Sequence, residues 1–460
     1  MTGFSRSPWL PDASRTRSRS NCGEHCQRTS PCSSPTCHEN RRRAPPVPTP
    51  GWRKVTKRLL NPSQAGRLPQ LDFLRGMAIL LVMGRHQPVY PNEAGSSWFR
   101  FFPAILSRFG WTGVDLFFVL SGFLVGGLLF KEFNTQKKMD IGRFLIRRIF
   151  KIWPSYYAYL AFLFVLMTVT GELGDMKSLT IKMLPQLSHL QNYLGMVRTH
   201  TWSLAIEEHF YLALPVVLLC ASRSRPRPFA SVPLIAITLA ISCLVWRLYL
   251  FFSGVPYGND HYLFPTHLRV DSLFFGVLLA FLHHCRADIL EPIIPHRKAL
   301  LAAGLLLLCP ILFLAKETCA FVPTIGLTEI YVGYGCILLA VVHTPLGEGW
   351  LGSFLNSRPA RIVAWIGCFS YSIYLWHLDL GRDPVRWLMS RGFLFHLPPE
   401  LRWCFAMLLF VCLASCAGAL LGSLIEMPAL ALRNRLFPAR ADALPNATIV
   451  SATRAKGPNS

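Results

Sequence analysis

The chain contains six long runs without any aspartate, glutamate, lysine or arginine. Each approaches the roughly 20 residues that an α-helix needs to cross the hydrocarbon core of a bilayer. Four further runs are equally apolar but are interrupted by isolated charges. We therefore predict an all-α polytopic membrane protein with about ten transmembrane helices, within the residues 72–90, 111–130, 152–171, 204–222, 229–246, 268–285, 299–315, 330–347, 362–378 and 403–425.

Composition agrees with this class. Hydrophobic residues make up 52% of the 460 residues and charged residues only 15%, against roughly 25% in an ordinary globular protein. These values exclude a disordered chain, a coiled coil and a collagen-like chain. The net charge of +23 lies in a basic N-terminal segment and in short connections between apolar runs, which favours topology signals and contacts with anionic lipids over nucleic-acid binding.

The apolar pattern divides the chain into three parts. Residues 1–67 are predicted to be a basic, disordered tail, residues 68–430 a transmembrane domain, and residues 431–460 a short cytosolic tail. The first part holds four cysteines with two neighbouring histidines. A zinc site is conceivable there, but the spacing fits no common zinc finger, and the surrounding serine, arginine and proline favour disorder. These residues are Cys22, Cys26, Cys32, Cys37, His25 and His38.

The connections alternate in charge along the chain. Those after the second, fourth, sixth and eighth runs carry most of the lysine and arginine, and an even number of spans explains that alternation. By the positive-inside rule both termini are predicted to face the cytosol, and we expect the protein in the cell membrane.

Ionisable residues inside apolar runs are costly and are functional candidates by default. Arg75 and His86 lie 11 positions apart, which places them on one helix face about 16 Å apart along the axis. Spacing alone also allows Arg75 to snorkel to one interface while His86 ends the helix at the other. The full set is Arg75, Arg85, His86, Asp115, Glu207, Glu208, His209, Arg247, Arg269, Asp271 and His377.

Three further clusters stand near the ends of runs. Glu207 and Glu208 follow Trp202 and are either functional carboxylates or acids of a first helical turn, where the helix dipole favours negative charge. For this cluster considered by itself, the second explanation is slightly preferred. Arg269 and Asp271 cannot face each other on a helix, so each is expected to have an interhelical partner. Ser370, Tyr374 and His377 share one helix face, as packing groups or as substrate contacts.

Ser121 and Gly122 are expected to allow close helix packing.

Six segments, in chain order, resemble the motifs of the acyltransferase-3 family of integral-membrane acyltransferases. The first, Leu71–His86, resembles the family's first-helix signature, which carries an arginine and a histidine separated by ten residues. The others are Gly113–Val125, Arg143–Tyr156, Trp202–Pro215, Thr266–Ala280 and Ser370–His377.

The resemblance implies a ten-helix enzyme that transfers an acyl group, often acetyl, to a sugar hydroxyl of a cell-surface glycan or secondary metabolite. It implies cytosolic acyl-CoA as co-substrate, with no tightly bound cofactor and no metal. The family's functional arginine and histidine correspond to Arg75 and His86. Its basic loop corresponds to Arg147 and Arg148, and its acidic motif to Glu207 and Glu208. We expect no appended esterase-like domain.

These expectations combine into one mechanistic hypothesis. His86 acts as general base on the acceptor hydroxyl, and Arg75 acts on the donor. Glu207 or Glu208 orients His86 or binds sugar hydroxyls, and a covalent acyl-His86 intermediate stays open. Expected substrate contacts are Arg147, Arg148, Trp202, Arg269, Asp271, Tyr374 and His377. A transporter without covalent chemistry is the main alternative, although the two similar halves common in transporters are not visible.

Overall fold

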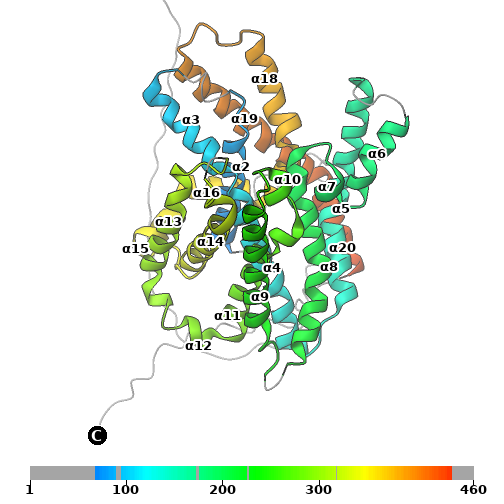
Figure 1. Ribbon diagram of the computed structural model, residues 1–460, viewed down its shortest axis with the longest axis vertical. Coiled ribbons are helices and arrows are strands. Elements are labelled where there is room, and N and C mark those ends of the chain that lie inside the picture. Colours follow the sequence, from blue (N-terminus) through cyan, green and yellow to red (C-terminus); the bar gives the residue numbers. More distant parts are fainter. Residues whose placement is uncertain (1–67, 90–94, 172–175, 225–226, 318, 438–460) are drawn as a thin grey trace, which may run out of the picture. The chain divides into compact units, whose positions relative to one another are not determined.

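The computed structural model describes residues 68–89, 95–171, 176–224, 227–317 and 319–437, and within them every regular element is a helix (Figure 1). The predicted N-terminal tail, with its cysteines, and residues 438–460 lie outside the described residues.

All ten predicted runs form helices, so the protein is an all-α polytopic membrane protein, as predicted. Within the described residues, seven helical stretches are long and apolar enough to cross a membrane on their own. The three that fall short are the charged first helix, the shorter α11, and the ninth run, which is broken. The helices are α2 (Pro69–Arg85), α4 (Gly113–Gln136), α5 (Ile141–Val169), α8 (Trp202–Ser222), α9 (Val232–Phe252), α11 (Val270–Cys285), α13 (Arg297–Phe313), α14 (Leu327–Val342), α16 (Arg358–Cys368) with α17 (Ser370–Trp376), and α19 (Pro399–Leu421).

Shorter helices connect these spans. The two longest are α3 (Ser97–Gly110), which follows α2, and α6 (Met176–Leu187), which follows α5. The rest are α7 (Gln191–Leu194), α10 (Asn259–Tyr262), α12 (Ala287–Leu290), α15 (Gly349–Leu355), α18 (Asp383–Ser390) and α20 (Met427–Leu436). The 3₁₀ helices are η2 (Thr199–Thr201), η3 (Thr266–Leu268) and η4 (Ile294–His296), and the π-helices are η5 (Val322–Gly326), η6 (His377–Arg382) and η7 (Gly422–Glu426).

The ninth run is not the continuous span that its apolar pattern predicts. Helix α16 ends at Cys368, Phe369 leaves the helical conformation with ψ near 10°, and α17 begins at Ser370. The chain then widens into the π-helix η6 and continues as α18. A π turn holds one more residue than an α turn, and such turns are frequent at functional sites. The π-helical part begins at His377.

Glycines bring the central helices into direct backbone contact. A Cβ placed on Gly122 of α4 would lie 1.9 Å from the carbonyl oxygen of Leu273 on α11. Similarly, a Cβ on Gly367 of α16 would lie 1.8 Å from the carbonyl oxygen of Asp72 on α2. The predicted close packing at Gly122 is therefore confirmed, and it is the kind of contact that holds helices together in lipid, where no hydrophobic force drives their association.

Two buried ion pairs join neighbouring helices. Arg269 donates to Asp115 of α4 at 2.5 Å, and Arg247 of α9 donates to Asp271 of α11 at 2.8 Å. All four side chains are at most 1% exposed. The expectation that Arg269 and Asp271 each have an interhelical partner is confirmed.

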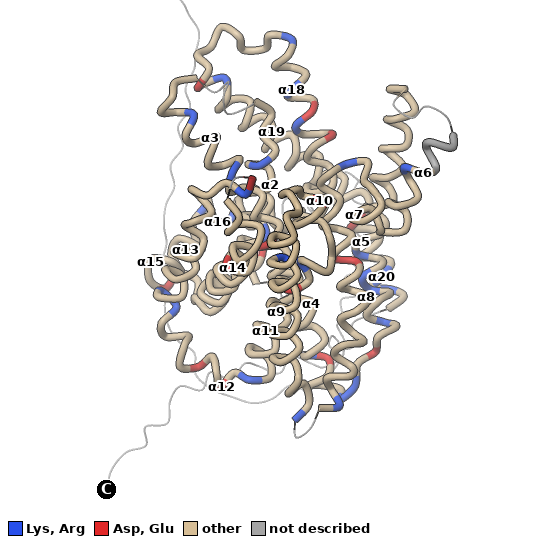
Figure 2. Tube along the Cα trace, viewed as in Figure 1, with Lys and Arg blue, Asp and Glu red and all other residues tan. Residues whose placement is uncertain are grey.

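Connections that the sequence assigns to one side of the membrane gather at one end of the bundle. At the end of α4, Asn134 donates to the carbonyl of His284 in the last turn of α11, and Phe133 packs on Phe229 before α9. Figure 2 shows lysines and arginines on connections at this end, beside α12. The end of α9, helix α3 and the loop after α13 lie at the other end, where Arg108 donates to the carbonyl of Phe313. The alternation of sides therefore agrees with the charge pattern.

This arrangement gives a topological prediction. Reporter fusions that end after Lys138 and after Ser253 should report opposite sides, because these residues follow α4 and α9 at opposite ends of the bundle. A phosphatase reporter is active only outside the cytosol and a fluorescent protein folds best inside it, so the pair gives complementary signals. Equal phosphatase activity at both positions would contradict the arrangement.

The glycine contacts give a stability prediction. Gly122→Ala should destabilise the protein by about 1–3 kcal/mol, because the added methyl group meets backbone that cannot move aside freely. Gly142→Ala is the matched control, since its added Cβ would find nothing closer than 3.9 Å. Thermal unfolding in detergent measures both. If the Gly122→Ala and Gly142→Ala proteins unfold at the same temperature, the contact between α4 and α11 tolerates separation of the two helices.

Candidate active site

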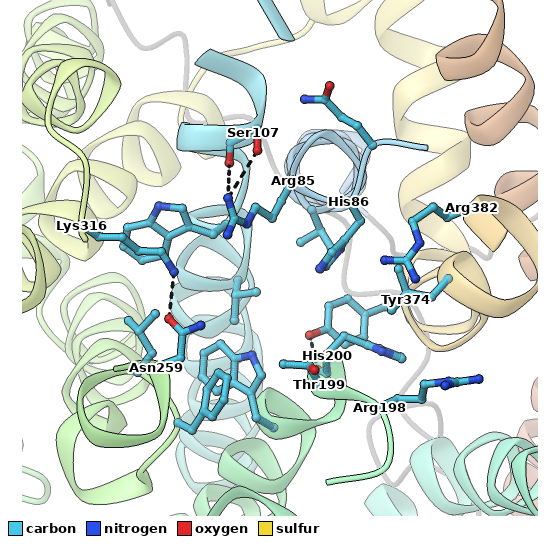
Figure 3. A pocket seen from close by; sticks show the side chains of 18 of the residues that line it. Arg85, His86, Ser107, Arg198, Thr199, His200, Asn259, Lys316, Tyr374 and Arg382 are labelled. Atoms are coloured by element: carbon cyan, nitrogen blue, oxygen red, sulfur yellow. Dashed lines mark hydrogen bonds between the residues drawn. The ribbon is translucent and has the colours of Figure 1, made fainter. Parts of the chain in front are cut away.

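Two cavities lie at opposite ends of α2. The first, named here the His86 cavity, has a volume of about 670 Å³ and is shown in Figure 3. Its wall combines residues of α2, α3, α4, η2, the start of α8, α10, the loop after α13, α17, η6 and α18. The polar and aromatic wall residues are Arg85, His86, Gln87, Ser107, Trp111, Arg198, Thr199, His200, Trp202, Asn259, Phe264, Lys316, Tyr374, Arg382 and Arg386.

The second, named here the Arg75 cavity, has a volume of about 410 Å³ and lies between α2, α4, α5, α8 and α17. Val114 and Tyr374 line both cavities, so the two spaces approach each other on either side of these two residues. The polar wall residues of the Arg75 cavity are Arg75, Ser121, Arg148, Lys151, Ser203, Glu207, Tyr211, Ser370, Tyr371 and Tyr374.

Helix α2 contributes one predicted residue to each cavity. Arg75 lines the Arg75 cavity, and it pairs with Asp72 one turn earlier at 3.5 Å, as the spacing predicts. His86 immediately follows the helix as its C-terminal cap and lines the other cavity. Arg75 and His86 are therefore separated along α2, as the sequence predicts, and each lines a different cavity.

His86 is oriented by another histidine. Its Nδ1 lies 3.0 Å from Nε2 of His377, whose own Nδ1 lies 2.7 Å from the carbonyl oxygen of Tyr374. Because a carbonyl only accepts, Nδ1 of His377 carries the proton and its Nε2 accepts. His86 must therefore donate through Nδ1, which leaves its Nε2 unprotonated in the neutral ring. An unprotonated Nε2 is the atom that a general base uses.

Tyr374 forms the polar part of the wall between the cavities. Its hydroxyl donates to the backbone carbonyl of His200 at 2.7 Å and accepts from Ser203 at 2.6 Å. His200 in turn approaches the carbonyl of Leu375 through Nε2 at 3.2 Å. These bonds tie the start of α8 to α17, so the position of His377 is fixed by two elements far apart in the chain.

The two predicted glutamates lie beside the other cavity. Tyr211 donates to Glu207 at 2.7 Å, and Glu207 lines the Arg75 cavity. Glu208 accepts a hydrogen bond from Trp153 at 3.3 Å. The expectation that one of them orients His86 is therefore wrong, because His377 holds that position. The sequence could not show this, because it identifies the glutamates and His86 only as ionisable residues in apolar runs. It does not show which of these side chains are in contact.

The basic segment that the resemblance assigns to a loop lies in helix α5, and its cations have different contacts. Arg148 lines the Arg75 cavity, with its guanidinium 5.9 Å from the ring centre of Tyr211. Lys151 lines the same cavity and forms an ion pair with Glu426. Arg147 instead donates to the backbone carbonyl of Phe437 at 2.6 Å.

Of the remaining predicted substrate contacts, some line a cavity and others do not. Trp202 lines the His86 cavity and packs against Phe264, with ring centres 5.2 Å apart. Arg269 and Asp271 line neither cavity and serve the buried ion pairs. Sequence reasoning missed Lys316, which comes from a loop after an apolar run and carried no motif.

The fold and these cavities define a polytopic membrane protein in which one helix places an arginine on the wall of one cavity and is capped by a histidine on the wall of another. A family model described as an acyltransferase domain matches residues 68–424. The chain therefore belongs to the acyltransferase-3 family, as its motifs indicate.

Similar proteins include two O-acetyltransferases. The peptidoglycan O-acetyltransferase OatA of Listeria monocytogenes is 29% identical over 332 residues, which cover 68% of this chain and 49% of the relative. The O-acetyltransferase OatA of Staphylococcus aureus is 27% identical over 343 residues, covering 71% and 53%. The chain spans about half the length of these curated relatives. No solved structure gives a significant match.

Proposed function

We propose that the protein is a cell-membrane O-acetyltransferase, with both termini in the cytosol, that moves an acetyl group from acyl-CoA to a hydroxyl of a sugar-containing acceptor. The observation that carries the proposal is the pair of cavities that approach each other at Tyr374, one holding Arg75 and the other His86. Family membership and the names of the relatives support acyl transfer over transport. The peptidoglycan named for the Listeria relative suggests a glycan of the cell envelope as acceptor.

The Arg75 cavity suits the donor. It lies at the end of the bundle where the basic connections gather, and Arg148 and Lys151 stand on its wall. Positive charge there attracts the phosphates of CoA. Arg75 has further N–H groups that can bind the anionic part of the donor and hold it in this cavity.

The His86 cavity suits the acceptor. Nε2 of His86 takes the proton of the acceptor hydroxyl as its oxygen forms a bond to the thioester carbon. The carbon–sulfur bond then breaks, and the CoA thiolate takes the proton back from His86. His377 accepts from Nδ1 of His86 throughout and keeps the ring in the productive tautomer and orientation. This is the part that an aspartate plays in many triads.

Loss of the base gives the first test. His86→Ala should lower acetyl transfer by about 10²–10⁴-fold, the contribution of a positioned general base, with the amount of folded protein unchanged. The assay uses labelled acetyl-CoA and soluble peptidoglycan strands with the protein in nanodiscs, where both faces are accessible. Undiminished transfer by His86→Ala would exclude this mechanism.

The positioning role of His377 gives a second test in the same assay. His377→Leu removes the acceptor for Nδ1 of His86 and should lower kcat with KM nearly unchanged. His377→Gln offers an amide oxygen that can accept the same hydrogen bond, so it should recover part of kcat. Equal kcat for the leucine and glutamine variants would show that His377 only packs.

Arg75 is tested by keeping its charge. Arg75→Lys should lower transfer by about tenfold or more, because an ammonium lacks the planar fork that can bind two oxygens at once. Arg100→Lys is the control, since Arg100 is exposed on α3. If Arg75 merely snorkels, both lysine variants should keep full activity.

A further inference from the structure

The His86 cavity has an excess of positive charge. Five basic side chains line it, and among the described residues none that line it is acidic. Two of the five are paired with carboxylates behind the wall: Arg198 lies 2.8 Å from Asp379, and Arg382 lies 2.7 Å from Asp383.

Arg85 and Lys316 differ from these two, because each is held only by neutral partners. Arg85 donates from Nη1 to the carbonyl and hydroxyl oxygens of Ser107, at 3.2 and 3.3 Å. Lys316 donates to Asn259 at 2.9 Å and stands over the ring of Trp111 at 5.4 Å. Within the described part of the chain, neither forms an ion pair with a carboxylate.

The positions of both groups are fixed by packing. A Cβ on Gly110 of α3 would lie 2.6 Å from the backbone nitrogen of Arg85, so α3 lies directly against the end of α2 and keeps Ser107 beside the guanidinium. Lys316 is buried, with 7% of its surface exposed. Each retains further N–H donors, since an arginine has five and a lysine three.

Such an arrangement is costly without an anion. Burial and then the positive charge of Arg85 lower the pKa of Lys316 to about 8, although the exposed Glu317 acts in the opposite direction. A buried ammonium beside a guanidinium, neither of which forms an ion pair with a carboxylate of the described residues, destabilises the wall of the cavity. A bound anion would remove that cost and would accept the unused N–H groups.

We propose that Arg85 and Lys316 form an anion subsite that binds a carboxylate or phosphate group of the acceptor. The proposal rests on the proposed function in one respect, namely that the acceptor enters the His86 cavity. Figure 3 shows Lys316 and Arg85 on one side of the cavity and His86 with Tyr374 on the other. An acceptor whose anionic group is bound by Lys316 and Arg85 would present a hydroxyl to His86. Trp111 and Trp202 also line the cavity and add apolar area that a sugar ring can contact.

The test measures binding directly, with the protein in nanodiscs and three synthetic probes. Each probe is a short N-acetylglucosamine oligosaccharide that ends in a carboxylate, in the methyl ester of that carboxylate, or in a phosphate. The charged probes should bind about 10- to 100-fold more tightly than the ester, the range expected for charge-assisted hydrogen bonds. The tighter of the two charged probes identifies the anionic group.

Variants then locate the subsite. Lys316→Gln and Arg85→Gln should each remove most of the preference for charged probes while binding of the ester stays the same, and Lys316→Arg should keep the preference. Arg100→Gln, which removes an exposed charge from α3, controls for general attraction. Equal binding of all three probes, or a preference that survives both glutamine variants, would overturn the proposal.

The same proteins separate this proposal from the proposed function. His86→Ala should lose transfer and keep the preference for charged probes. Undiminished transfer by His86→Ala would remove the proposed base and leave the anion subsite standing. Loss of transfer without any charge preference would remove only the subsite.

Discussion

The contact between α2 and α16 sets the geometry of both cavities. Gly76 and Gly367 let the two backbones approach so closely that a Cβ on either would overlap a carbonyl oxygen of the other helix. This contact fixes the rotation and height of α2 against the chain that continues into α17. Arg75 and His86 are then held at their places by backbone packing, and His86 meets His377 at hydrogen-bonding distance. A bulkier pair of residues would separate the helices and with them the two histidines.

The break in the ninth span allows one segment to serve both cavities. A continuous α-helix would present Tyr374 and His377 along one regular stripe. Instead, α17 begins after Phe369 and gives way to a π turn at His377, and Tyr374 reaches both cavities. In lipid such irregular backbone is tolerated only where it is buried in protein or lines a cavity. The wall between the cavities meets that condition.

Sequence reasoning predicted what depends on local pattern. Apolar runs gave the spans, helical periodicity gave the common face of Arg75 and His86, and the cost of lone charges required partners for Arg269 and Asp271. It could not identify those partners, because Asp115 and Arg247 come from other helices. The contact between His86 and His377 joins positions 291 residues apart, and no periodicity reports such a distance. Lys316 was missed because a loop residue beside an apolar run looks like an interfacial anchor.

A histidine as the partner of His86 suits a cavity rich in cations. A carboxylate in its place would be drawn toward the neighbouring arginines, as Asp379 is to Arg198 and Asp383 to Arg382. A neutral imidazole accepts the hydrogen bond from Nδ1 of His86 without adding a negative charge that would attract the neighbouring arginines. Under the proposed mechanism, the imidazolium that forms on His86 lies next to Arg85 and is destabilised by it. Any charge of Arg85 that a bound anion leaves uncompensated favours return of the proton from His86 to the leaving thiolate.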